Sequence, residues 1–295
     1  MSALANVLEN RCAIVTGASR GLGFEIARSY LEAGASVVIC ARESVALETA
    51  ADTLRRVARP GQSVLAVPAD VSRPADVTRL VDGALAALGR LDILVNNAGV
   101  AGPVGTVEAV DWQEWFRALE INLLGAVLLS RAVVPRFKQA GGGKIIQLSG
   151  GGATSPLPTL SAYAASKAAV IRFVETLAEE TRPHRIDVNA IAPGALNTRM
   201  LEDFLAAGPQ RAAPELYRRW LEQKRDGGVP LSRGAELAVF LGCDLSNGIT
   251  GKLLSAVWDP WRTLPAHLDE LNASDVYTLR RIKPEDRHMS WGGGG

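Results

Sequence analysis

The sequence predicts an α/β fold: a Rossmann-like, doubly wound, parallel sheet of seven strands with helices on both faces. Short segments rich in β-branched residues alternate with longer segments in which apolar residues recur every three or four positions. The short segments are apolar almost throughout, as expected for parallel strands that are buried on both faces. The spacers between them are long enough for crossover helices.

Seven strands are expected in order along the chain, at residues 12–16, 36–40, 63–67, 91–96, 144–148, 185–191 and 252–256. Helical periodicity is clearest in three of the segments between them, at residues 21–33, 74–88 and 162–182. In segment 199–229 the alternation of strand and helix patterns is interrupted by Gly, Pro and residues of both charges. We interpret this segment as a mobile lid over the substrate, with a surface loop as the alternative. After residue 256 the pattern stops, and segment 257–291, which holds three of the six tryptophans, is expected to pack as an appendage.

Composition excludes several classes of protein. The 295 residues carry 32 Lys and Arg against 31 Asp and Glu, and this balance argues against a basic nucleic-acid platform. A hydrophobic fraction of 47% with 21% charged residues indicates a folded chain. The longest apolar stretch, residues 121–129, is shorter than the ~20 residues that a bilayer requires, and the N-terminus lacks the pattern of a signal peptide. We expect no membrane partner and a cytoplasmic location.

The cysteines indicate neither a disulfide framework nor a metal site. Cys12, Cys40 and Cys243 are widely separated and lie in apolar surroundings, and the three histidines are scattered. We expect buried thiols and no metal.

A glycine-rich segment follows the first strand directly and opens a helix. Gly17, Gly21 and Gly23 allow a tight turn and a close approach of the backbone to a pyrophosphate, while the helix N-terminus offers free N–H groups. This setting predicts nucleotide binding.

The end of the second strand favours NADP(H), with NAD(H) as the alternative. An NAD-binding fold usually places a carboxylate there for the ribose 2′-OH, whereas this strand ends in Ala41 and Arg42. Arg42 and Arg20 are able to hold a 2′-phosphate by charge-assisted hydrogen bonds. The alternative is that both arginines are simply exposed to solvent. The neighbouring carboxylate of Glu43 weakens the case for a phosphate site.

Tyr163 and Lys167 are four residues apart and therefore share one helical face. A nearby ammonium favours the phenolate, so this pair is suited to proton donation and acceptance.

Five motifs in order resemble those of the short-chain dehydrogenase/reductase family. They are the segments 16–23, 96–99 and 193–194, Asn122, and the pair Tyr163 and Lys167. The resemblance covers residues 11 to 256 and implies an enzyme that interconverts a ketone and a secondary alcohol by hydride transfer. It also implies a small-molecule carbonyl or alcohol substrate and a homodimer or homotetramer. Residues 1–256 are then expected to form one Rossmann-type catalytic domain, with a substrate lid at about 199–230 and a C-terminal extension at 257–295.

The resemblance implies roles for individual residues. Tyr163 is the acid or base, Lys167 lowers its pKa and holds the nicotinamide ribose, and Asn122 anchors a water in a proton relay. Asp70 with Val71 corresponds to the adenine contact, Asn97 to a residue that stabilises the sheet, and Thr198 to the carboxamide contact. The full set implied to bind the cofactor is Gly17, Ser19, Arg20, Gly21, Leu22, Gly23, Arg42, Asp70, Val71, Asn97, Ala98, Gly99, Tyr163, Lys167, Pro193, Gly194 and Thr198.

One position departs from the family pattern. The family's substrate-polarising serine stands thirteen residues before the tyrosine, and that count falls on Gly150. The nearest serine is Ser149, which an ordinary strand would turn to the other face unless the following glycines allow a bulge. We predict that Ser149 fills the catalytic role; the alternative is a serine that caps the strand end while another group supplies the hydrogen bond.

Three further groups of aromatic or charged residues each allow two interpretations. Trp112 and Trp115 are expected in the core or a subunit contact, with a ligand platform as the alternative. The basic residues of the lid are expected on a solvated face, with attraction of an anionic substrate as the alternative. Trp258, Asp259 and Trp261 are expected in an oligomer interface, with closure over the site as the alternative.

Two other functions are considered beside the oxidoreductase. A catalytically silent NADP-binding regulatory or assembly subunit is suggested only by the shifted serine. A sugar-nucleotide epimerase or dehydratase is disfavoured, because the glycine spacing is GxxxGxG and only about forty residues follow the last strand. The sequence leaves open whether the substrate is an oxoacyl thioester, a sugar or cyclitol, or a secondary metabolite.

Overall fold

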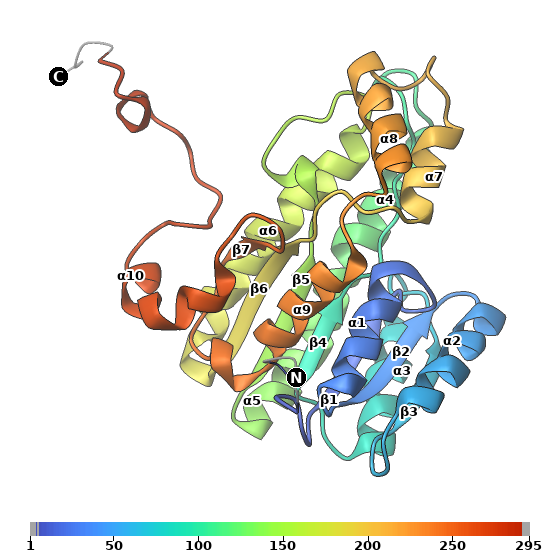
Figure 1. Ribbon diagram of the computed structural model, residues 1–295, viewed down its shortest axis with the longest axis vertical. Helices are drawn as coiled ribbons and strands as arrows, with labels where there is room; N and C mark the ends of the chain where they lie inside the picture. The colour runs from blue at the N-terminus through green and yellow to red at the C-terminus, as the bar shows by residue number, and fades with distance from the viewer. Residues whose placement is uncertain (1–3, 5, 291–295) are drawn as a thin grey trace.

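The computed structural model describes residue 4 and residues 6–290, and its centre is a seven-stranded sheet (Figure 1). The strands lie in the order β3-β2-β1-β4-β5-β6-β7, and every neighbouring pair is parallel. The sheet therefore winds outwards in both directions from β1 and β4, which confirms the predicted fold class. The strands are β1 (Cys12–Thr16), β2 (Ser36–Ala41), β3 (Val64–Pro68), β4 (Ile93–Asn96), β5 (Gly143–Leu148), β6 (Ile186–Ala192) and β7 (Leu253–Ser255).

Helices cover both faces of the sheet. Alternation along β1 shows how the strands are buried on both sides: Ala13 and Val15 pack into one apolar cluster and Ile14 into the other. The first cluster includes residues of α1 (Gly21–Glu32), α2 (Ser44–Val57) and α9 (Leu231–Gly242). The second includes residues of α3 (Pro74–Leu88), α5 (Gly125–Ala140) and α6 (Ser161–Thr181).

The helix that precedes α5 is interrupted by a wider turn. Asp111 begins α4 (Trp112–Leu119) by accepting a hydrogen bond from the Glu114 N–H at 2.8 Å. A π-helical turn, Glu120–Leu124, then joins α4 to α5 without a loop. By length and composition alone, the run Trp112–Ala140 is long and apolar enough to cross a membrane, which the sequence analysis did not foresee. Its buried residues pack against the sheet, so we interpret the run as a core helix.

Two short helices form what we call the lid, α7 (Arg199–Ala206) and α8 (Pro214–Asp226). Together they stand beyond one end of the sheet (Figure 1). Phe204 and Trp220 stack with their ring centroids 4.9 Å apart, and Leu160 packs into the same cluster. The segment predicted as a lid is thus a pair of helices with its own apolar contacts.

The chain after β7 packs against the body as far as Leu279. A 3-10 segment, Trp261–His267, and α10 (Leu268–Asn272) bury Trp261 against Phe240, with the ring centroids 5.1 Å apart. Residues 280–290, which we call the arm, extend away from the body (Figure 1). Shorter 3-10 turns lie at Gly151–Ala153, Arg182–His184, Asp244–Ser246 and Pro284–Arg287.

All three cysteines are buried and unpaired. Burial raises the pKa of Cys12 to about 11 and that of Cys40 to about 12, so both thiols stay protonated at neutral pH. Within residues 6–290 and residue 4, no group of three or more His, Cys, Asp or Glu side chains is placed to hold a metal ion.

Candidate active site

A large cleft opens at the carboxyl ends of the strands, beneath the lid. Its volume is about 1640 Å³, and it runs from the glycine-rich segment past Tyr163 to α8. Pockets for one small ligand are commonly about 300–1,000 Å³, so this cleft has room for two. In an open α/β sheet, the carboxyl edge where the winding reverses is also the usual ligand site.

The glycine-rich segment forms a cradle in which side chains have no space. Gly17 has a φ of +64°, and a Cβ atom there would lie 2.8 Å from the Ala98 Cα. A Cβ atom at Gly23 would lie 2.4 Å from the Asn97 Nδ2. The side chain of Arg20, the residue before α1, makes no capping hydrogen bond to the helix N-terminus. The backbone and the free N–H groups therefore fit a dinucleotide pyrophosphate.

Asn97 and Thr16 join this cradle to β4. The Asn97 side-chain amide donates to the carbonyl oxygens of Thr16 at 2.8 Å and Gly17 at 3.2 Å. In return, the Thr16 hydroxyl accepts hydrogen bonds from the N–H groups of Asn97 and Ala98, each at 3.0 Å. This network fixes the relative position of the first and fourth strands beside the cleft.

At the adenine side of the cleft, Asp70 is held by protein groups. Its carboxylate accepts hydrogen bonds from the Arg117 guanidinium at 2.6 Å and from the Ser72 hydroxyl at 2.7 Å. Burial pushes the pKa of Asp70 upwards, but the hydrogen bonds from Ser72 and the Arg117 contact outweigh it and leave the pKa below its usual value. Arg117 comes from α4, 47 residues along the chain, and no sequence motif indicated it.

Arg20 and Arg42 both line the cleft near the end of β2. Both side chains are exposed, and neither makes a hydrogen bond or an ion pair within the described residues. Two guanidinium groups are therefore available to an anion at this point.

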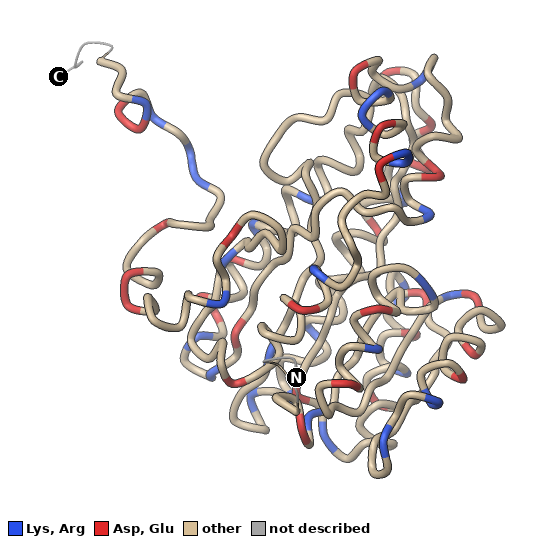
Figure 2. Tube along the Cα trace, viewed as in Figure 1, with Lys and Arg blue, Asp and Glu red and all other residues tan. Residues whose placement is uncertain are grey.

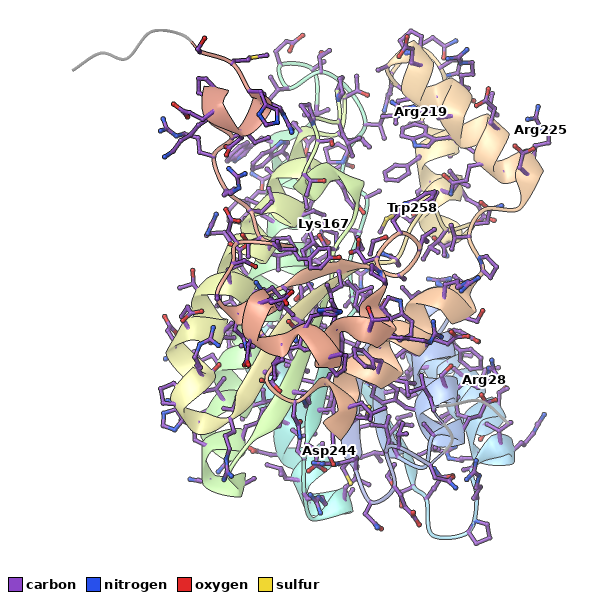
Figure 3. The ribbon with its side chains drawn as sticks, turned by 60° about the vertical axis from the view of Figure 1, so that its left-hand side comes forward. Arg28, Lys167, Arg219, Arg225, Asp244 and Trp258 are labelled. Atoms are coloured by element: carbon purple, nitrogen blue, oxygen red, sulfur yellow. The ribbon has the colours of Figure 1, made fainter. Side chains whose placement is uncertain are left out.

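Tyr163 and Lys167 meet at the centre of the cleft, on the first two turns of α6. The Lys167 ammonium lies 5.7 Å from the centroid of the Tyr163 ring and donates a hydrogen bond to the Leu148 carbonyl at 3.1 Å. Figure 3 shows Lys167 in the interior, between the sheet and the lid. The structure thus brings together the pair that the sequence singled out.

Burial dominates the pKa of both groups. It raises the pKa of Tyr163 to about 12 and lowers that of Lys167 to about 8. The family resemblance implies that Lys167 lowers the pKa of Tyr163, whereas the shift in the structure is upward and is caused by burial. At neutral pH Tyr163 is therefore a neutral phenol with a proton to donate.

Asn122 sits in the π-helical turn, almost fully buried. Its side chain accepts a hydrogen bond from the Val100 N–H at 2.8 Å and donates to the Val100 carbonyl at 3.0 Å. It also donates to the Ser166 hydroxyl at 3.0 Å, and Ser166 donates to the Tyr163 carbonyl at 2.8 Å. Asn122 is thereby connected to the helix that carries Tyr163 and Lys167, and π-helical turns are frequent at functional sites.

The end of β5 presents Gly150, and not Ser149, to the tyrosine hydroxyl. A Cβ atom at Gly150 would lie 2.4 Å from the Tyr163 oxygen. Ser149 lines the cleft and is buried, and its hydroxyl has no hydrogen-bond partner among the residues that the structure describes. A buried hydroxyl without a partner is uncommon and indicates a ligand or an ordered water nearby.

The cleft beside Tyr163 has an apolar wall that no sequence pattern indicated. Leu157, Phe204 and Trp220 line the cleft, and the Phe204 ring meets the Tyr163 ring edge to face at 5.9 Å. Basic and acidic residues are interspersed along α8 (Figure 2), and Arg225 pairs with Asp226 at 2.7 Å, as expected of a solvated face. No periodicity could have identified Phe204 as a neighbour of Tyr163, because their contact depends on how the lid folds back.

Trp258 also borders the cleft. Its side chain is 83% exposed and lies near the space between the sheet and the lid (Figure 3). Asp259 lines the cleft too, and its carboxylate accepts a hydrogen bond from the Ser255 N–H at 2.6 Å. Trp261, in contrast, is part of the core.

Most residues predicted for the site line this one cleft. Gly23 and Asn122 lie behind its wall, where they contact Asn97 and Val100. Those on the wall are Gly17, Ser19, Arg20, Gly21, Leu22, Arg42, Asp70, Val71, Asn97, Ala98, Gly99, Ser149, Tyr163, Lys167, Pro193, Gly194 and Thr198.

Comparison with known proteins places this architecture among characterised relatives. The family model for short chain dehydrogenases matches residues 11–207. The chain is 41% identical over 252 residues to a short-chain type dehydrogenase/reductase of Picea abies, a match that covers 84% of the chain and 91% of that protein. It is 32% identical over 250 residues to the 7alpha-hydroxysteroid dehydrogenase of Escherichia coli (strain K12), covering 84% and 93%. A crystal structure of 3-ketoacyl-(acyl-carrier-protein) reductase from Brucella melitensis complexed with NADH superposes with a TM-score of 0.73 at 32% identity, covering 87% of this chain and 99% of that one.

Proposed function

The chain belongs to the short-chain dehydrogenase/reductase family of oxidoreductases, and from this premise we propose that it interconverts a ketone and a secondary alcohol with a nicotinamide cofactor. The observation that carries the proposal is that the half-buried Tyr163 and the buried Lys167 lie together in one cleft with the glycine cradle. A proton donor and a dinucleotide site in a shared cleft are what carbonyl reduction requires.

The chain's own residues provide binding, orientation and a proton. When bound, the nicotinamide supplies the hydride. Gly17 and the N-terminus of α1 hold the pyrophosphate, while Tyr163 donates its proton to the substrate oxygen as negative charge develops there. Lys167 places a positive charge beside the phenol and holds the ribose hydroxyls. Asn122 fixes the first turns of α6 through Ser166 and takes part in returning the proton from solvent.

We assign Ser149 the role of polarising the substrate carbonyl. Support comes from its buried hydroxyl, which lines the cleft and has no partner in the described part of the chain. The assignment requires the substrate oxygen to approach the end of β5 from the Ser149 side.

For the cofactor we propose a preference for NADP(H). Arg20 and Arg42 are the support, since both line the cleft and neither is engaged by another described residue. No carboxylate stands at Ala41, the last residue of β2, to bind the ribose 2′-OH or repel a 2′-phosphate. The Brucella relative was crystallised with NADH, so NAD(H) is the alternative cofactor.

For the substrate we propose a ketone with an apolar body. Phe204, Trp220 and Leu157 supply an aromatic and aliphatic wall next to Tyr163. The charged residues of α8 that line the cleft, such as Arg219, are exposed to solvent.

We also propose a homo-oligomer. Trp112, Phe116 and Leu124 are exposed on the helical run that begins at α4, with Trp112 64% exposed. Trp112 and Trp115 stack at 5.5 Å, which gives this face a rigid aromatic surface typical of subunit contacts.

The test is nicotinamide absorbance with the purified protein, NADPH or NADH, and a panel of cyclic apolar ketones, oxoacyl thioesters and keto-sugars. The proposal expects turnover with the apolar ketones and loss of that turnover in Tyr163→Phe. Tight NADPH binding without turnover on any class, including oxidation of the matching alcohols, would favour the silent regulatory or assembly subunit, which the glycine at position 150 supports.

A further inference from the structure

The carboxylate of Asp70 is held in one orientation by two other residues. Ser72 donates two hydrogen bonds to its Oδ1 atom, from the backbone N–H at 3.0 Å and from the hydroxyl at 2.7 Å. The bond from the N–H two residues ahead is an Asx turn, which the local chain can form by itself. The Oδ2 atom accepts a hydrogen bond from Nη2 of Arg117 at 2.6 Å. Because each oxygen has a separate partner, the plane of the carboxylate is fixed.

Arg117 also holds the other partner of this carboxylate. Its second terminal nitrogen, Nη1, donates to the Ser72 hydroxyl at 2.8 Å and to the Glu120 carboxylate at 3.3 Å. One guanidinium therefore closes a ring with Asp70 and Ser72. A carboxylate that accepts three hydrogen bonds beside a guanidinium charge stays ionised at neutral pH, so Asp70 offers only hydrogen-bond acceptors.

The next residue, Val71, is positioned by the same helical run that carries Arg117. A Cβ atom at Gly125, the first residue of α5, would lie 2.7 Å from Cγ2 of Val71, so Val71 packs directly on the backbone of that helix. Asp70 and Val71 both line the cleft, and the wall here also includes Ala69, Val100 and Ile121. An acceptor among apolar side chains fits the edge of a flat heterocycle that carries an N–H group.

The place of Asp70 in the sheet decides which half of a dinucleotide it meets. Asp70 follows β3, whereas Lys167 and Tyr163 lie at the end of β5, and the glycine cradle follows β1, which stands between these strands in the sheet. Under the proposed function, the nicotinamide lies beside Tyr163 and the pyrophosphate lies on the cradle. The adenine end then lies on the β3 side, where the amino group of adenine is a donor for the Asp70 carboxylate.

We propose that Arg117 is a positioning residue for adenine recognition: by holding the Asp70 carboxylate in place, it makes the cleft select a purine with an amino group at position 6 over one with a carbonyl oxygen there. Arg117 itself is not among the residues that line the cleft, so it acts through Asp70. The orientation of the cofactor in this proposal rests on the proposed function.

The first experiment measures binding and needs no substrate. Calorimetry gives the Kd of NADP+ and of its hypoxanthine analogue, in which a carbonyl oxygen replaces the adenine amino group. We expect the wild type to prefer NADP+ by at least about tenfold, the usual size of a hydrogen bond to a charged group, and Arg117→Met to prefer it by less than about threefold. Arg55→Met is the matched control and should keep the preference, because this exposed arginine of α2 pairs with Glu48 and Asp52 away from the cleft.

The second experiment asks whether Arg117 acts through Asp70. In the Asp70→Asn background, adding Arg117→Met should change the preference no further, because the carboxylate that Arg117 holds is already absent. In the wild-type background, Arg117→Met should raise the KM for the cofactor and leave kcat at saturating cofactor within about twofold. A purely structural role would instead weaken the binding of both dinucleotides equally and leave the preference intact.

Equal binding of the two dinucleotides by the wild type, or a preference in Arg117→Met equal to that of the wild type, would overturn the proposal. If the wild type binds the dinucleotides but turns over no ketone or alcohol, the proposed function fails. The change in preference between wild type and Arg117→Met then still decides whether Arg117 positions Asp70.

Discussion

The ring of Phe204 meets the ring of Tyr163 edge to face, with 5.9 Å between their centroids. The lid is therefore part of the wall around the proton donor and not only a cover above it. By excluding water from the phenol, this contact contributes to the burial that raises the pKa of Tyr163 to about 12. It also means that a substrate reaching Tyr163 has to displace or pack against an aromatic side chain.

Replacement of the proton donor tests its role most directly. Tyr163→Phe removes one oxygen and should lower kcat by about 100-fold to 10,000-fold, the usual contribution of general acid catalysis, while NADPH still binds. Turnover and cofactor affinity are read by absorbance and by nucleotide fluorescence. Tyr217→Phe, on α8 and in contact with Trp220, is the control and should keep its activity. Equal activity in the two variants would contradict the assignment of Tyr163.

The buried ammonium predicts a dependence of stability on pH. The pKa of Lys167 is lowered from 10.5 to about 8 by burial, so between these pH values the unfolded chain binds more protons than the folded one. The free energy of unfolding should rise with pH in this window, by up to about 3 kcal/mol, whereas below pH 8 the cost of burying the charge is fully present.

Urea unfolding at pH 7 to 10 measures this rise, and Lys167→Met should reduce it. Lys138→Met, at the exposed end of α5, is the control and should leave the rise unchanged. A rise of the same size in wild type and Lys167→Met would show that another group is responsible.

Replacement of Arg42 should weaken the use of NADPH and leave the use of NADH almost unchanged. Loss of a charge-assisted hydrogen bond to a 2′-phosphate costs about 1.5–3 kcal/mol, so Arg42→Ala should raise the KM for NADPH at least tenfold and leave that for NADH within twofold. Steady-state kinetics with both cofactors provide the measurement. Arg56→Ala, an exposed arginine of α2 that does not line the cleft, serves as the control. A parallel rise for both cofactors would argue against a phosphate site.

Ser149 should matter for rate more than for cofactor binding. Removing a hydrogen-bond donor to the developing oxyanion commonly costs about 100-fold to 1,000-fold in kcat, and Ser149→Ala should fall in that range. Ser155→Ala, exposed and outside the cleft, is the matched control. Near-normal turnover of Ser149→Ala would mean that the carbonyl is polarised by another group.

The chain after β7 should divide into a part needed for stability and a part that is dispensable. Leu253 donates a backbone hydrogen bond to the Tyr277 carbonyl at 2.8 Å, and the Leu279 N–H donates to the Glu175 carboxylate at 2.6 Å. A chain that ends at Asn272 loses these contacts and should lose roughly 2–5 kcal/mol of stability, whereas one that ends at Leu279 should keep its Tm. Thermal unfolding of both truncations decides this; an unchanged Tm for the shorter chain would contradict the role of these contacts.

How far the sequence predicts this protein depends on the range of the interactions involved. The sequence pattern located all seven strands to within one or two residues. Burial on both faces of the sheet requires consecutive apolar residues, such as Ala13, Ile14 and Val15, and such a run is visible in the sequence itself. The pair Tyr163 and Lys167 was equally local, since four residues make one helical turn.

Contacts between distant segments were not predictable. Arg117 reaches Asp70 from another helix, Phe204 reaches Tyr163 from the lid, and the tyrosine fills the space beside Gly150. Each depends on how separate elements pack, for which a single sequence carries no periodic signal. The rise in the pKa of Tyr163 was not predictable for the same reason, because the sequence does not report how deeply the ring is buried.

The π-helical turn limits which insertions and deletions this gene can tolerate. The turn carries one residue more than an ordinary α-helical turn, and each helical residue advances the chain by about 100°. Deleting a single residue from segment 120–124 would straighten the helix and rotate its two halves against each other. Either Asn122 would then leave Val100, or Val133 and Phe137 of α5 would turn away from the sheet. A one-residue length change here therefore damages the catalytic side and the core together, while the same change at the exposed end of the arm should pass unnoticed.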